Sequence, residues 1–181
     1  MAKLLIMCEG NNELTVVNLL LDANRFLFTR DDLLGLVPYH ARQIKSSSIV
    51  RLALEQYNNK VEVLRIGDIL SDLLVIPDEY LSLISSVSKF CTKPELEILL
   101  IINEGKYNEY AKLKAGSHKI SPKSFCKANI IYGHTQYDNS SDFYRRYYGK
   151  RIDLLVNNIK TYHQLQKAHR KDEYYLASLL K

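Results

Sequence analysis

The sequence predicts an α/β fold in which a mostly parallel sheet is flanked by helices, with a helical C-terminal extension. The first observation is the unbroken apolar run at residues 3–8, which is typical of a central strand covered on both faces. The second is a tight turn at residues 9–12, followed directly by apolar residues at helical spacing. The third is a later apolar run at residues 61–66, which ends at Gly67-Asp68. Strands that alternate with helices in this way favour parallel pairing.

The elements between these strands follow from local signals. Leu14, Val17 and Leu21 recur at helical spacing and predict a helix over residues 13–23. A short second strand is expected within residues 36–44. The serines at 46–48 can cap a helix that ends at Asn58-Asn59.

After residue 72 the pattern is mostly helical. Helices are expected over residues 79–87, from Pro94 past Gly105, and at Ser121 or Pro122. A final pair is expected over residues 151–168 and 172–180. The chain thus divides into an α/β core at 1–115 and a basic, tyrosine-rich helical extension at 116–181, which we expect to form one compact unit with the core.

Composition excludes several classes of protein. Of the 181 residues, 46% are hydrophobic and 25% are charged, as in soluble globular domains. No apolar run approaches the ~20 residues that span a bilayer, and the first run lacks the pattern of a signal peptide. Cys8, Cys91 and Cys126 form no metal or disulfide motif and are expected to be buried thiols. The sequence therefore predicts a cytoplasmic protein without membrane contact.

Four acidic positions fall where a parallel sheet presents ligands, at or beyond the carboxyl ends of strands. Glu9 follows the first strand, Asp68 follows the strand at 61–66, and Asp72 comes four residues later. Glu97 lies early in the helix expected from Pro94. Hard cations such as Mg²⁺ (or Mn²⁺) prefer carboxylate oxygens, so these four form a candidate metal site. Taken one by one, each is better explained as a helix-start charge, a turn residue or a solvated helix face. Taken together, the placement of Glu9 and Asp68 directly after the two clearest strands favours a site.

The C-terminal third is basic. Residues 145–171 contain eight lysines and arginines and one acid, which favours a polyanionic partner. The candidate nucleic-acid contacts are Arg145, Arg146, Lys150 and Arg151. The nearby aromatic residues, Phe143 and its tyrosine neighbours, either stack on bases or pack the C-terminal helices.

These motifs resemble a known family. The stretch LLIMCEGNNE at residues 4–13 resembles the opening strand and acidic turn of Toprim domains, more narrowly those of the small RloB-like and OLD-type proteins. The stretch KPELEILL at residues 93–100 is similar to the family's segment with a glutamate on an apolar helix. The resemblance covers residues 3–104.

The resemblance implies a Toprim-like (Rossmann-like) fold with roles for particular acids. Glu9 would bind metal or transfer protons, Asp68 and Asp72 would be aspartate ligands, and Glu97 would be the helix glutamate. Toprim proteins usually carry aspartates two residues apart, whereas Asp68 and Asp72 are four apart.

The expected function is Mg²⁺-dependent phosphodiester processing of nucleic acid, with DNA as the expected substrate, in prokaryotic defence or a mobile element. Glu9 and Asp68 would be the catalytic residues. One alternative is a non-catalytic Toprim-like module that binds nucleic acid or serves an ATPase as a partner subunit. Another is a small-molecule phosphotransferase or phosphatase that uses the same carboxylates.

Overall fold

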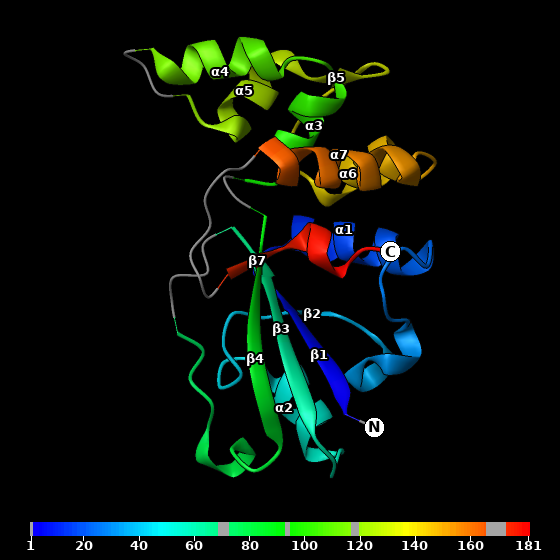
Figure 1. Cartoon of the computed structure of the whole chain (residues 1–181), viewed down its shortest axis with the longest axis vertical. Helices are drawn as coiled ribbons and strands as arrows, with labels where there is room; N and C mark the ends of the chain where they lie inside the picture. Colours follow the sequence, from blue (N-terminus) through cyan, green and yellow to red (C-terminus); the bar gives the residue numbers. More distant parts are fainter. Residues whose placement is uncertain (1, 69–72, 93–94, 117–119, 166–172) are drawn as a thin grey trace.

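The computed structural model describes residues 2–68, 73–92, 95–116, 120–165 and 173–181. Its centre is a five-stranded, all-parallel sheet with the strand order β2-β1-β3-β4-β7, consistent with a Rossmann-like fold (Figure 1). The strands are β1 (Lys3–Cys8), β2 (Tyr39–His40), β3 (Val61–Gly67), β4 (Ile84–Cys91) and β7 (Glu173–Tyr175). The predicted α/β class and parallel pairing are confirmed.

Helices cover the sheet on both faces and gather beyond the carboxyl ends of its strands (Figure 1). They are α1 (Asn11–Asp22), α2 (Ser48–Glu55), α3 (Ile98–Asn103), α4 (Tyr107–Ala115), α5 (Pro122–Asn129), α6 (Ser141–Tyr148) and α7 (Ile152–Leu165). A small hairpin, β5 (Ile131–Tyr132) and β6 (Thr135–Gln136), joins α5 to α6. None of the helices in the described ranges combines the length and apolar character needed to cross a membrane.

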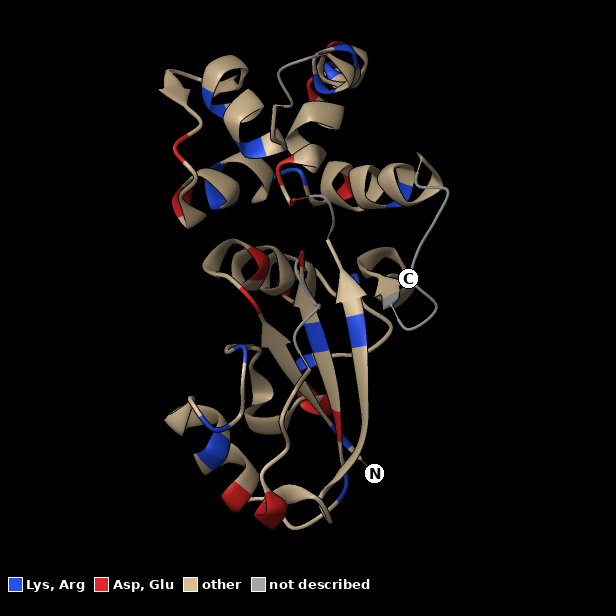
Figure 2. Ribbon diagram, turned by 90° about the vertical axis from the view of Figure 1, so that its left-hand side faces the viewer, with Lys and Arg blue, Asp and Glu red and all other residues tan. Residues whose placement is uncertain are grey.

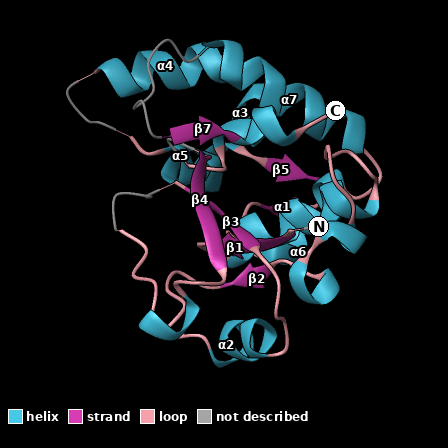
Figure 3. Cartoon of the chain, turned by 60° about the horizontal axis from the view of Figure 1, so that its bottom comes forward, coloured by secondary structure: helices cyan, strands magenta, loops and turns pink. Residues whose placement is uncertain are grey.

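The two faces of β1 explain its unbroken apolar run. Leu5 and Met7 belong to the smaller of two buried clusters, which lies against α2. Ile6 and Cys8 belong to the larger cluster, which includes residues of α1 and of the C-terminal helices. Figure 3 shows α2 on one side of the sheet, away from the other helices. A strand between two helical layers needs apolar residues at every position, as the sequence predicted.

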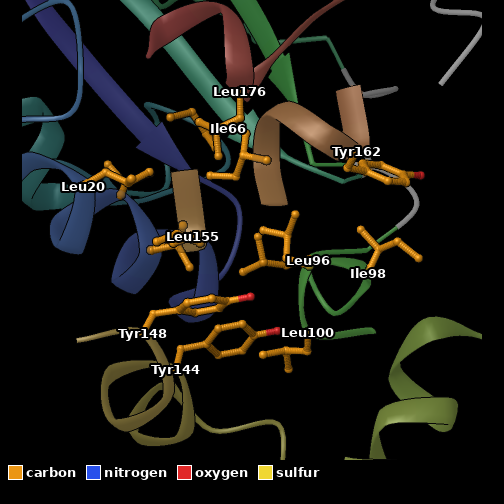
Figure 4. Packing of buried hydrophobic residues seen from close by; sticks show 14 of the residues in the cluster. Leu20, Ile66, Leu96, Ile98, Leu100, Tyr144, Tyr148, Leu155, Tyr162 and Leu176 are labelled. Carbon is orange, nitrogen blue, oxygen red and sulfur yellow. The ribbon is translucent and has the colours of Figure 1, made fainter. Parts of the chain in front are cut away.

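The larger cluster is rich in buried tyrosines. Tyr144, Tyr147 and Tyr148 of α6 have no exposed surface, and Figure 4 shows Tyr144 and Tyr148 among the leucines of this cluster. Their hydroxyls have partners: Asn158 donates to Tyr148 Oη, and Asn103 donates to Tyr147 Oη. Of the two roles considered for these rings, helix packing is therefore confirmed.

Two expected helices are strands in part. Residues 79–87 were predicted to be helical, yet only a 3₁₀ turn (Asp78–Tyr80) precedes β4. Residues 172–180 were also predicted to be helical, but their described part holds β7 and a 3₁₀ turn (Leu176–Leu179). Both segments are strands because they pair in parallel with a neighbour: β4 pairs with β3, and β7 pairs with β4. Such pairing depends on tertiary context and gives no pattern in the local sequence.

The helix expected from Pro94 past Gly105 is two helices. Gly105 has a φ of 67°, in the left-handed region that glycine adopts readily. Its N–H donates to the carbonyl of Ile102, which closes the end of α3 before α4 begins. The glycine is therefore a helix terminator here.

Candidate functional site

A cleft of about 500 Å³ opens at the carboxyl ends of β1 and β3. It is lined by Glu9, Gly10, Asn11, Asn12, Glu13, Arg42, Asp68, Glu95, Leu96, Glu97, Lys123 and Asn139. Three of the predicted acids, Glu9, Asp68 and Glu97, thus share one cleft. Figure 2 shows acidic positions in red around the strand ends and at the start of the helical layer beyond them. The fourth acid, Asp72, lies outside the described residues.

Glu9 is held at the end of β1 by backbone and side-chain contacts. Its N–H donates to the carbonyl of Ile66, so it extends the pairing of β1 with β3. Its Oε1 lies 3.0 Å from Nη2 of Arg42, and its side chain is 9% exposed. A Cβ on Gly67 would lie 2.4 Å from Glu9 Oε2 and 2.6 Å from Glu9 Cβ. Position 67 therefore leaves room for Glu9 only because it is glycine.

Glu13 is an acid whose role at the cleft the sequence did not predict. It lies in the first turn of α1, where a carboxylate interacts favourably with the helix dipole. Burial raises its pKa to about 7, and the negative charges of Asp68, Glu97 and Glu9 add to this effect. A Cβ on Gly10 would lie 2.6 Å from Glu13 Oε2, so a second glycine makes room for a carboxylate. The signal in the sequence that could have indicated this role is the position of Glu13 four residues after Glu9.

Glu97 is the most buried of these acids, with 4% of its surface exposed. It stands at the N-cap of α3, and its carbonyl accepts from the N–H groups of Leu100 and Ile101. Tyr137 donates a hydrogen bond of 2.5 Å to Glu97 Oε1. Burial raises the pKa of Glu97, and the hydrogen bond from Tyr137 partly opposes this. A hydroxyl donor therefore supports the charged form inside an apolar layer.

Glu95 lines the same cleft but has a structural partner. Its Oε2 accepts a 2.8 Å hydrogen bond from the backbone N–H of Lys123 in the first turn of α5. Carboxylates commonly satisfy free N–H groups at this end of a helix. Glu95 thus fixes α5 against the cleft and brings Lys123 to its wall.

The donors at this cleft suit a hard cation. Every acidic or amide side chain that lines it offers oxygen, and within the described ranges it has neither histidine nor cysteine. In the same part of the chain, no group of three or more aspartate, glutamate, histidine or cysteine side chains is placed so that it could hold a metal ion. Mg²⁺ commonly takes one or two protein carboxylates and completes its shell with water and substrate phosphate. The cleft fits that mode of binding.

The predicted nucleic-acid contacts divide into two groups. Arg145, Arg146 and Lys150 are exposed, and Arg145 forms a surface ion pair of 2.7 Å with Asp142. The guanidinium of Arg151 instead lies 4.3 Å from the ring centre of Tyr147 and 4.5 Å from that of Tyr132. Arg151 therefore has a packing role in the described structure, whereas the other three present their charge to solvent.

All three cysteines are buried, as expected. Burial raises the pKa of Cys8 and Cys126 and keeps both thiols protonated. Neither thiol is activated as a nucleophile.

Comparison with known proteins identifies no relative of this chain. No protein-family model matches the chain, and neither the curated proteins nor the solved structures include a significant match to it.

Proposed function

We propose that the cleft binds Mg²⁺ or Mn²⁺ and that the protein processes phosphodiester bonds in nucleic acid, with DNA as the expected substrate. The observation that carries the proposal is the meeting of Glu9, Glu13, Asp68 and Glu97 in one cleft. Burial raises the pKa of Glu13, and the negative charges of Asp68, Glu97 and Glu9 raise it further; a divalent cation would relieve that repulsion.

Glu9 and Asp68 are the best placed ligands for such an ion. They follow β1 and β3, which are adjacent strands in parallel register, with Cys8 opposite Ile66. Each acid comes from the end of its strand and lines the cleft. A bound cation would polarise a phosphodiester and lower the pKa of bound water.

Other residues of the cleft suit the remaining tasks. Glu13 has a pKa of about 7, so it can hold or release a proton near neutral pH. Arg42 and Lys123 line the cleft together with the acids and offer positive charge to phosphate oxygens. The exposed Arg145 and Arg146 of α6 offer further phosphate contacts beyond the cleft.

The proposal is tested with purified protein on supercoiled and linear DNA in Mg²⁺ or Mn²⁺. Glu9→Gln and Asp68→Asn should each lower cleavage at least ~100-fold, because each would remove a metal ligand. The melting temperature should stay nearly unchanged. Glu62→Gln is the matched control, since Glu62 is an exposed acid of β3 that does not line the cleft. A large fall in melting temperature with either cleft variant would favour a structural role for that acid.

A second candidate is a non-catalytic module that binds nucleic acid or serves an ATPase as a partner subunit. The observation that favours it is the ion pair of Arg42 with Glu9, which places a protein cation beside a proposed metal ligand. This candidate predicts salt-sensitive DNA binding without cleavage in either metal. Metal-dependent cleavage that Glu9→Gln abolishes would eliminate it.

A further inference from the structure

The carboxylate of Glu97 is held by a residue from a distant part of the chain. Tyr137 follows the β5–β6 hairpin and is 2% exposed. Its hydroxyl lies 2.5 Å from Glu97 Oε1, forty positions away in sequence. A charge-assisted bond this short fixes the acceptor oxygen in place.

The ring of Tyr137 has little freedom to move. It packs edge-on against Phe143 at 5.1 Å and against Tyr144 at 6.1 Å between ring centres. Both partners belong to the fully buried face of α6. The packed rings therefore hold the Tyr137 hydroxyl in one direction. Side chains that are locked by packing in this way preorganise a site.

The same hydroxyl connects Glu97 to the cleft wall. Tyr137 Oη lies 3.0 Å from Oδ1 of Asn139, and that oxygen accepts a 3.1 Å hydrogen bond from Nδ2 of Asn12. Asn12 Oδ1 in turn accepts from Ser141 at 3.3 Å. Asn139 has a φ of 64°, in the left-handed region that asparagine tolerates better than most residues. These contacts fix the segment between β6 and α6 against the start of α1.

We infer that Tyr137 is a positioning residue for the proposed site: its hydroxyl fixes one oxygen of Glu97 and thereby directs the other oxygen toward a cation in the cleft. The Glu97 backbone is held at the N-cap of α3 and one of its oxygens is bound by Tyr137, so the planar carboxylate has little freedom to turn its second oxygen. The inference rests on the proposed function, because it assigns Glu97 to the metal. Residues that orient metal ligands in this way commonly change affinity about 10- to 100-fold when they are removed.

The test is Mn²⁺ binding to the purified full chain, measured by isothermal titration calorimetry. Tyr137→Phe removes the hydroxyl and keeps the ring, so it should raise the Kd for Mn²⁺ by about 10-fold or more. Tyr144→Phe is the matched control. It removes a buried hydroxyl from the same cluster, 3.5 Å from that of Tyr137, and should leave the Kd within about 2-fold of wild type. Melting temperatures of both variants report any loss of folding.

A double-mutant cycle separates positioning from general packing. If Tyr137 acts through Glu97, then Tyr137→Phe should change the Kd little when Glu97 is already replaced in Glu97→Gln. An effect of equal size in both backgrounds would overturn the inference, as would a wild-type Kd in Tyr137→Phe. Wild-type protein that binds no Mn²⁺ would overturn the proposed function and this inference together. Wild-type binding that Tyr137→Phe leaves unchanged would overturn the inference alone.

Discussion

At the scale of single residues, two glycines that lie beside acids, Gly10 and Gly67, best explain how the cleft holds its carboxylates. Gly10 was predicted to be a turn residue on the basis of conformational freedom, and Gly67 was expected only to mark the end of a strand. In the structure neither has a positive φ, and a Cβ at either position would collide with a carboxylate, of Glu13 and Glu9 respectively. Their small size makes room for buried acids at the strand ends. The sequence showed the glycines, but the reason for them requires the three-dimensional neighbours.

Gly67→Ala should destabilise the fold and displace Glu9. Its Cβ would meet Glu9 Oε2 at 2.4 Å and Glu9 Cβ at 2.6 Å, so Glu9 or the end of β3 must shift. Overpacking of this kind costs about 1–3 kcal/mol in the free energy of unfolding, measurable by urea denaturation. Gly116→Ala is the control, because its Cβ would make only an ordinary contact at 3.4 Å. Equal stability of the two variants would contradict the proposed packing.

Glu13→Gln should make stability less dependent on pH. The folded protein holds the pKa of Glu13 at about 7 against an ordinary value of 4.5. A raised pKa favours folding fully below pH 4.5, and the benefit is lost as pH rises toward 7. The amide carries no charge, so the variant should be more stable than wild type at pH 8, by about 3 kcal/mol. Thermal unfolding at pH 5 and pH 8 measures this, and an advantage larger at pH 5 would contradict it.

At the scale of elements, prediction succeeded where the signal is local. The strand β1 and the cap of α2, where Ser47 accepts from the N–H of Val50, follow from neighbouring residues. The strand β4 has three exposed residues in succession after Ile84, which hides the alternation that marks a strand. β7 pairs over only three residues. Both depend on partners far away in the chain, and no local pattern could reveal them.

The basic residues of α6 should matter for binding rather than for folding. Replacing Arg145 and Arg146 by alanine should weaken DNA binding for all sequences and reduce the slope of log K against log salt by about one per residue. Fluorescence anisotropy over a salt series measures both effects. An unchanged slope would exclude these arginines as phosphate contacts.

Arg151→Ala provides the contrast within the same basic segment. Its guanidinium lies against the rings of Tyr132 and Tyr147, so its loss should lower stability by about 1–2 kcal/mol. Its effect on the salt slope should be small. A loss of DNA affinity with unchanged stability would instead place Arg151 among the nucleic-acid contacts.

At the scale of the whole molecule, the cleft is assembled from segments spread between residues 9 and 139 of the chain. Glu9, Asp68 and Glu97 were predicted from strand ends and a helix start, and the fold places all three in one cleft. Lys123 and Asn139 also line it, and they come from the C-terminal extension that was expected to form one compact unit with the core. No spacing rule connects residues so distant in sequence. Lys123 and Asn139 reach the cleft only because the C-terminal helices fold over the sheet.

A cleft of this kind should make the whole protein respond to divalent cations. A ligand present at 100 times its Kd stabilises the folded state by about 2.7 kcal/mol, or roughly 5–10 °C in melting temperature for a domain of this size. The effect of Mg²⁺ or Mn²⁺ should be larger at pH 8 than at pH 6, because protons compete for Glu13 near its pKa of about 7.

Differential scanning fluorimetry at constant ionic strength measures this response, with NaCl as the reference for screening. Asp68→Asn should abolish the shift, and Glu62→Gln should retain it. A shift that survives the loss of both Glu9 and Asp68 would locate the cation elsewhere on the protein. If millimolar metal does not shift the melting temperature of the wild-type protein, a divalent cation is not the counter-ion of the buried acids. In that case Arg42, already paired with Glu9, would be the cation that the cleft is built to hold.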